Sequence, residues 1–511
     1  MQDLVTQLNP LNRITLIGKL RYYLLDRYYN RIVQGTLITL AILLTLVATF
    51  LFREVDLGAT PLTGFVVLAP IVIVAGFLLL YRTMHLSLLI FMPVSLFLWE
   101  GINVGTGTKI SFLFVLIMAW LIIWFYKMLV IDRRIEIAAA APNKLAWAFI
   151  TVAIISYFWS WVFADPMVQS LIERRFNPRT MTLVMLIISP LTYMFIATHV
   201  RSIQVIKWFV IGFLATGIPF AYLQNIWQGR PGILNWQGQY PVWIVAIALG
   251  QLLYNRSLKL WHRVVLVVMI VWWVYNQLGL GLSWLSGWVP ITFVVTFLTF
   301  SYSRRLFALL VLAAAIWVIA NSTLLGDNFE RENEESGGTR QEAWSVALDY
   351  SSRHPLFGMG PAGYAFYYAV DNWPTLNFSH NNYIDIIAQT GIAGIVTFVG
   401  MWLAMCWTAW RTYRLVPKGG FRGALAVSLL ASMLSIIIIM MLGDWVTPFT
   451  YTQTLFGINY TIWAWFLAGL TIALRYETLN YLKSQSDSSE SHPVIARTQV
   501  GHLPAVSASH Q

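Results

Sequence analysis

The stretch ALAVSLLASMLSIIIIMML, residues 424–442, decides the fold. It contains only apolar and small polar residues, and none of them is charged. A helix of about 20 such residues is long enough to cross the hydrocarbon core of a bilayer. A helix that is apolar on all sides must be buried in protein or in lipid.

Comparable apolar runs recur along the chain and predict about 14 membrane spans, with roughly 12 to 14 as the range. The long runs begin near Gly35, Leu62, Ser111, Leu145, Met181, Trp208, Val264, Leu306, Tyr383, Ala424 and Gly457, and shorter or interrupted ones begin near His85, Gln239 and Trp288. The expected fold class is therefore an all-α integral membrane protein.

The composition excludes a soluble protein. Hydrophobic residues make up 58% of the 511 residues and charged residues only 11%, whereas a soluble domain has about 25% charged residues. The 24 Trp residues suit two membrane interfaces. The net charge of +11 needs no nucleic-acid partner, because Lys and Arg collect in cytoplasmic loops. Membrane lipids are the expected surroundings.

The connecting segments alternate in basic content, and the positive-inside rule then places both termini in the cytoplasm of a multi-pass inner (plasma) membrane protein. One exterior segment, Asn321 to Ser379, is long, and loops longer than about 15 residues are usually functional or disordered. The expected organisation is a basic cytoplasmic segment 1–34, a transmembrane region 35–320, an exterior loop 321–382 that contains short helices, C-terminal spans 383–475 and a disordered cytoplasmic tail 476–511.

A capped helix is predicted within the exterior loop. Thr339 and Glu342 have the spacing of a capping box, and the following apolar positions lie on one face of a helix that ends before Pro355. Arg340 falls in the first turn, where a cation is disfavoured by roughly 0.3–1 kcal/mol. A bound anion would reverse that cost. The alternative is a solvated arginine paired with nearby glutamates, Glu332, Glu334 or Glu335.

Two further exterior features are candidates. Arg230 lies in the turn Gly-Arg-Pro-Gly, residues 229–232, and could bind an anion or a lipid headgroup. The segment 354–360, His-Pro-Leu-Phe-Gly-Met-Gly, has two glycines, Gly358 and Gly360, which permit a tight backbone path. His354 is interpreted as structural.

The densest polar cluster is Ser-His-Asn-Asn, residues 379–382. Asn382 followed by Asp385 resembles an N-cap, so His380 is expected just before a helix N-terminus. The partial positive charge there disfavours imidazolium and leaves a neutral ring that can act as a general base. Gly391 and Gly394 would let a neighbouring helix approach closely. The alternative is a capping histidine with glycines that serve packing only.

No metal or cofactor is expected. The chain has no His-x-x-x-His pair, no Asp-rich triplet and no Gly-x-x-x-x-Gly-Lys loop, and Asp371, Asp385 and Asp444 are isolated carboxylates. Any reaction is expected to draw its energy from an activated substrate.

Residues 354–394 resemble the O-antigen ligase and polymerase superfamily, the Wzy_C-type membrane glycosyltransferases. Residues 354–364 are similar to its His-Pro-Leu-x-Gly-x-Gly segment. His380-Asn381, nine residues, Gly391, two residues and Gly394 match the signature His-[Asn/Ser/Gln]-x9-Gly-x-x-Gly. Arg340 and Trp344 are similar to its Arg-x-x-x-Trp.

The resemblance implies a GT-C-like, metal-independent inverting enzyme that moves a glycan from a polyprenyl diphosphate to an acceptor hydroxyl at the exterior face. His380 would be the base, and Arg340 and Arg230 would hold the diphosphate. The other implied positions are substrate-binding Asn381, Trp344, Gly358 and Gly360, and structural Gly391 and Gly394. The acceptor would be a lipid or a glycan.

Two departures and two alternatives accompany this resemblance. The family usually has Ser-Arg-Gly where this chain has Leu285-Ser286-Gly287, and many members have Glu where this chain has Gln389. A polymerase of the same superfamily is one alternative function. A bicarbonate or solute transporter is another, although transport of an anion would require ionisable residues deep in the spans, and the span centres have almost none.

Overall fold

The computed structural model describes the chain from residue 101 to 490, apart from residues 104–108, 170–175, 227–237, 281–284, 333–336 and 373–378, together with a few positions between 89 and 96. The spans expected near Gly35 and Leu62, the basic segment 1–34 and the beginning of the span near His85 lie outside these residues. Arg230 also lies outside them.

The described residues form helices and one short antiparallel pair, β1 (Gly101–Asn103) with β2 (Lys109–Ser111). The helices up to the long loop are α5 (Phe112–Tyr126), α6 (Asn143–Val162), α8 (Phe176–His199), α9 (Ile203–Ile226), α10 (Tyr240–Tyr254), α11 (Leu260–Tyr275), α12 (Leu285–Tyr302) and α13 (Arg304–Ala320). The remaining ones are α14 (Ser322–Glu332), α15 (Gly338–Arg353), α16 (Gly363–Asn372), α17 (Asn382–Leu415), α18 (Phe421–Leu442), α19 (Thr450–Gln453) and α20 (Ile458–Glu490). Short π-helical turns follow α5 (Lys127–Ile131) and α11 (Asn276–Leu280), and a 3₁₀ turn (Thr454–Gly457) precedes α20.

Seven of the described helices are long and apolar enough to cross a membrane: α5, α6, α8, α12, α17, α18 and α20. Shorter apolar helices lie within α9 and α10. The chain is thus an all-α integral membrane protein, as the sequence predicts. Wherever a predicted span falls on described residues, a helix begins within a few positions of the predicted start.

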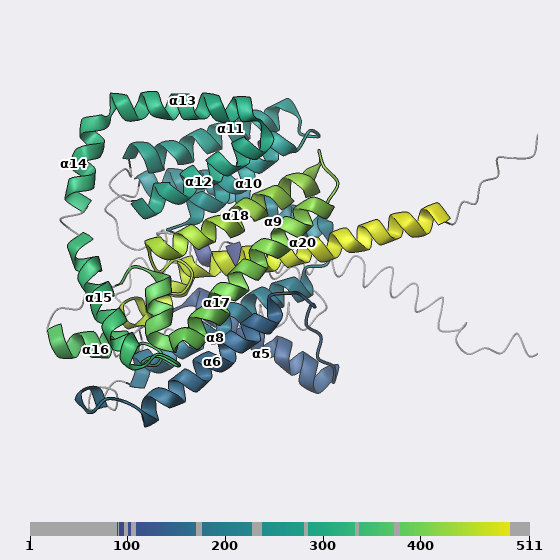
Figure 1. The fold of residues 1–511 in the computed structure, drawn as a ribbon. Coiled ribbons are helices and arrows are strands. Elements are labelled where there is room, and N and C mark those ends of the chain that lie inside the picture. The colour runs from purple at the N-terminus through teal and green to yellow at the C-terminus, as the bar shows by residue number, and fades with distance from the viewer. Residues whose placement is uncertain are drawn as a thin grey trace, which may run out of the picture.

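The centre of the bundle is built on α17, α18 and α20. Helix α20 packs on α8, and α17 packs on α18 and α6. Aromatic side chains fill the interior, where the Trp463 ring of α20 lies 5.1 Å from Phe213 and 5.5 Å from Tyr240, between ring centroids. At the periphery, α13 has no buried residue. Figure 1 shows α13, α14 and α15 following one another around the outside of the other helices.

Two boundaries differ from the prediction. Helix α20 continues to Glu490, past the tail boundary expected at residue 475. Arg422 of α18 bonds to Glu477 at 2.5 Å and lies over the Tyr481 ring, so α20 still packs on α18 beyond that boundary. In the long loop (residues 321–382), α15 begins at Gly338 with no side-chain cap. The predicted capping box is therefore wrong, since Thr339 lies inside the first turn. The predicted end before Pro355 is confirmed.

Helix α17 is broken near its start. Gly391 has φ 66°, a left-handed conformation that glycine adopts without strain. A side-chain carbon there would lie 2.6 Å from the Phe357 nitrogen. The element that approaches Gly391 is therefore the 355–360 turn, and not a neighbouring helix as expected. Gly394 makes room for a side chain of its own helix, because a side-chain carbon there would collide with the Thr390 side chain of α17.

Candidate active site

The 355–360 turn supplies the hydrogen bonds that the break in α17 leaves open. On one side of the break, Met359 N–H donates to Ala388 O at 2.8 Å and Gly360 N–H donates to Gln389 O at 2.9 Å. On the other side, Ile392 N–H donates to Pro355 O at 2.8 Å. Backbone groups left open within a membrane-spanning helix are stable only when they are paired inside the protein. The turn thereby fixes the long loop against the first segment of α17.

The two glycines of this turn adopt backbone conformations that other residues rarely adopt. Gly358 and Gly360 have φ values of 66° and 86°. A side-chain carbon at Gly358 would lie 2.6 Å from the Ala388 carbonyl oxygen, and one at Gly360 would lie 2.9 Å from Arg179 Nη2. Both positions therefore lie against protein, and the substrate-binding role that the resemblance implies for them stays a prediction. The structure brings the turn, α17 and the fully buried Arg179 together.

His380 lies just before α17, as predicted. It is half-buried and has φ 43°, and its ring centroid lies 6.4 Å from that of Phe449. The cap itself is Asn381, whose Oδ1 accepts hydrogen bonds from the N–H groups of Tyr383 and Ile384. The prediction of Asn382 as the cap is wrong by one residue. Since Asn381 caps the helix, the imidazole of His380 is not needed for capping.

Two charged groups act electrostatically on His380 in opposite senses. Burial lowers the pKa of His380 below the usual histidine value, Asp444 opposes this effect, and Arg340 adds to it. Burial also raises the pKa of Asp444, against the influence of His380 and of hydrogen bonds from Tyr460 and Gln453. The Tyr460 hydroxyl donates to Asp444 Oδ2 at 2.9 Å. His380, Asp444 and Arg340 therefore share one electrostatic site.

Helix α15 contributes two of the predicted site residues. Arg340 is half-buried in its first turn and acts on His380. One turn further on, the indole N–H of Trp344 donates to the backbone carbonyl of Ser379 at 2.5 Å. Trp344 therefore contacts the residue before His380, and its indole N–H is hydrogen-bonded within the protein.

A buried polar network lies behind His380 on α17. Gln389 Nε2 donates to the Asp385 carboxylate, and its Oε1 accepts from Ala362 N–H at 3.1 Å. The hydroxyl of Tyr451 donates to the other carboxylate oxygen of Asp385 at 3.2 Å. The amide at position 389 fits this arrangement, because a glutamate there could not donate to Asp385 unless it were protonated.

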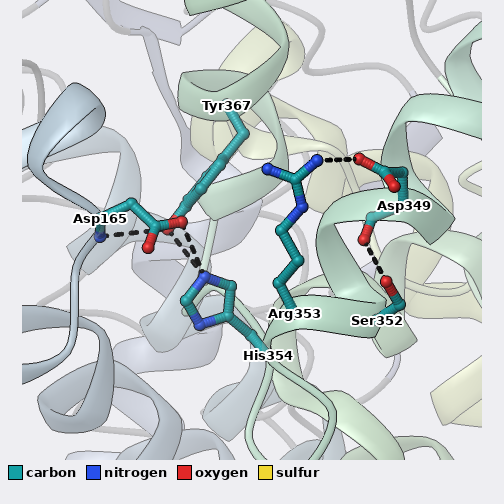
Figure 2. Close-up of polar contacts among 6 residues, drawn as sticks. All are labelled: Asp165, Asp349, Ser352, Arg353, His354 and Tyr367. Atoms are coloured by element: carbon teal, nitrogen blue, oxygen red, sulfur yellow. Dashed lines mark hydrogen bonds and ion pairs between the residues drawn. The ribbon is translucent and has the colours of Figure 1, made fainter.

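Figure 2 shows a second polar cluster, at the end of α15. The Asp165 carboxylate and the Tyr367 hydroxyl lie 3.0 and 3.1 Å from His354 Nε2. His354 thus ties the long loop to the segment between α6 and α8, in keeping with the structural interpretation. Its neighbour Arg353 pairs with Asp349 on the exposed face of α15.

Sequence reasoning missed several residues of the site. Asp444 stands directly after the apolar run 424–442, and a carboxylate at the end of such a run is a signal that it interpreted only as an isolated charge. Asn382 and Tyr451 carry no sequence signal of their contacts, because their partners Thr447 and Asp385 lie 65 and 66 residues away in the chain. Gln389 does carry one, since Asp385 lies four residues before it on the same helix. Among the described residues, no three or more His, Cys, Asp or Glu side chains come together.

Comparison with protein families matches residues 243–399 to Wzy_C, described as O-antigen ligase. The matched stretch begins in α10 and ends in α17, so it includes α15, the 355–360 turn and His380. Comparison with curated proteins gives no match.

Proposed function

Because residues 243–399 belong to the O-antigen ligase family, we propose that this membrane protein transfers a glycan from a polyprenyl diphosphate carrier to a hydroxyl of a lipid or glycan acceptor at the exterior membrane face. Membership of this family indicates membrane glycosyl transfer. The donor, the inverting course and the face of the membrane are parts of the proposal, as is an inner-membrane location with both termini in the cytoplasm.

His380 is the proposed general base. Its imidazole takes the proton of the acceptor hydroxyl while that oxygen attacks the anomeric carbon, and the bond from this carbon to the diphosphate breaks. A base for this step must be neutral at the working pH. The lowered pKa of His380 supports this role, since it keeps the ring unprotonated near neutrality. This observation carries the proposal.

Arg340 is the proposed partner of the leaving diphosphate, with Arg230 as a second cation. A guanidinium can donate two parallel hydrogen bonds to phosphate oxygens. Stabilising the charge that develops on the leaving group is electrostatic work of the kind that contributes most to such reactions. The electrostatic effect of Arg340 on His380 supports a site that holds the base and the leaving group near one another.

The substitution His380→Asn tests the proposal. Asparagine tolerates the left-handed conformation that His380 adopts, so the fold should survive. Transfer from a lipid-linked glycan in membranes should fall by roughly 10²–10⁴-fold. Binding of the lipid diphosphate should persist.

His262→Asn on α11 is the matched control, at equal expression, and should keep full transfer. Full activity in His380→Asn would eliminate His380 as the base. A wild-type protein that transfers no glycan from any lipid diphosphate would eliminate the proposed function.

A further inference from the structure

The link between α18 and α19, residues 443–449, faces His380. It carries Phe449, whose ring lies beside the imidazole, and Asp444, which acts electrostatically on it. The carboxylate of Asp444 is buried and is held from α20 by the Tyr460 hydroxyl. The charge that His380 faces therefore depends on where this link lies.

Asn382, the first residue of α17, is bonded to the link through both atoms of its amide. Its Nδ2 donates to the carbonyl of Thr447 at 2.8 Å and to the Thr447 hydroxyl at 2.7 Å. Its Oδ1 accepts from Val446 N–H at 3.1 Å and from Thr447 N–H at 3.4 Å. The side chain is fully buried. Asn382 thus connects the start of α17, just after His380, to Val446 and Thr447 of the link, just after Asp444.

These hydrogen bonds are not required to form α17. Its cap is Asn381, so the amide of Asn382 contributes nothing to the helix end. The link also has a second attachment, because the Trp465 indole N–H of α20 donates to Val446 O at 2.8 Å. Loss of Asn382 should therefore shift the link without unfolding the bundle.

We infer that Asn382 is a positioning residue whose amide fixes the link that carries Asp444 relative to His380. The inference rests on the proposed role of His380 as base and names what fixes the charge beside it. The charged and titratable groups of the site come from several elements: Arg340 of α15, Asp444 of the link, Tyr451 of α19, Asp385 of α17 and Tyr460 of α20.

The test is a double-mutant cycle on the titration of His380. Diethyl pyrocarbonate acylates imidazole in its neutral form and not imidazolium. The dependence on pH of its rate of reaction at His380 therefore gives the midpoint of the His380 titration without any glycan substrate. The rate would be followed by peptide mass spectrometry on the full chain in lipid nanodiscs. In the native background, Asp444→Asn should lower the midpoint by roughly one pH unit, because it removes a negative charge beside the ring.

In the Asn382→Ala background, Asp444→Asn should lower the midpoint by less than about half as much, because the link no longer holds residue 444 at the ring. An equal shift in both backgrounds would overturn the inference. If Asn382→Ala does not yield folded protein, Thr447→Val removes one acceptor of the amide and should reduce the shift in the same sense. An undiminished shift in Thr447→Val would then overturn it.

Asn143→Ala is the matched control. This asparagine of α6 also uses both amide atoms, donating to Ala138 O at 2.7 Å and accepting from the Tyr193 hydroxyl at 3.1 Å. Its loss should leave the full effect of Asp444→Asn on the midpoint. The proposed function is tested separately by glycan transfer. If the wild-type protein transfers no glycan but the Asp444→Asn shift still depends on Asn382, the proposed function is refuted and the positioning role of Asn382 stands.

Discussion

At the scale of single residues, the site contains two titratable groups, His380 and Asp444, whose pKa values are shifted by burial. His380 is half-buried, a carboxylate and a guanidinium act on it in opposite senses, and burial favours its neutral form. Asp444 is buried beside it, and its pKa is raised. Small changes of charge around His380 should therefore appear directly in the pH dependence of the reaction.

Replacing Arg340 should move the acidic limb of kcat/KM. The base must be unprotonated, so activity is lost as the pH falls through the pKa of His380, which places this limb below about pH 6.5. Arg340→Gln removes a positive charge, raises that pKa and should shift the limb to higher pH, with a lower rate. Arg340→Lys should keep the limb in place and recover only part of the rate.

The control is Arg353→Gln on the same helix, where the exposed guanidinium pairs with Asp349. This change should leave the limb and the rate unchanged. A limb that does not move in Arg340→Gln would show that Arg340 does not act on the base.

The pair Asp385 and Gln389 should behave as a donor–acceptor unit. Gln389→Glu places a second carboxylate against a buried one and removes the donated hydrogen bond, so we expect a loss of about 1–3 kcal/mol in the free energy of unfolding. Thermal unfolding in detergent measures it. Adding Asp385→Asn restores a donor facing the new carboxylate and should recover most of the loss. Equal melting temperatures for native and Gln389→Glu protein would contradict the assignment.

Residue-level prediction from the sequence succeeded where the signal was local. The position of His380 before a helix follows from neighbouring residues, and so does the end of α15 before Pro355. The capping box at Thr339 and the cap at Asn382 failed, because several residues in each stretch could serve as cap. The hydrogen bonds of Asn382 could not be predicted, since their partners Val446 and Thr447 lie 64 and 65 residues away in the sequence, and no periodicity reports such pairs.

At the scale of elements, the break in α17 was visible in the sequence only as two glycines. Their spacing was interpreted as room for a helix, whereas the structure places the 355–360 turn there. Apolar runs reveal that a span exists and where it begins, because they reflect burial in the bilayer. They do not reveal that a span is discontinuous, because the backbone groups freed at the break are paired by a distant segment.

Gly391→Ala should be much more harmful than Gly400→Ala on the same helix. At Gly391 the backbone is left-handed and a methyl group would collide with the turn, so a cost of about 1–3 kcal/mol arises from conformation alone. At Gly400 the nearest atom is a methyl carbon of Leu145 at 3.5 Å, an ordinary contact. The yield of monodisperse protein and its melting temperature measure both. Similar values for the two variants would refute the packing described at the break.

At the scale of the whole molecule, the alternation of basic segments predicts which parts share a side of the membrane. Cysteines at Gly338 in α15 and at Ser488 near the end of α20, in a Cys406→Ser background, should react with an impermeant thiol reagent from opposite sides. The native Cys406 is buried, so replacing it removes the native thiol from the labelling reaction and leaves the protein surface unchanged. Labelling of both positions from one side would refute the proposed topology.

The break in α17 has a consequence for how the protein is made. The carbonyl groups of Ala388 and Gln389 and the N–H groups of Ile392 and Ala393 find their partners in the 355–360 turn, which leaves the ribosome first. A discontinuous span whose partners are missing would bring unpaired peptide groups into lipid. The span from residue 382 can therefore settle only after the 355–360 turn, which is made before it, has packed against the break.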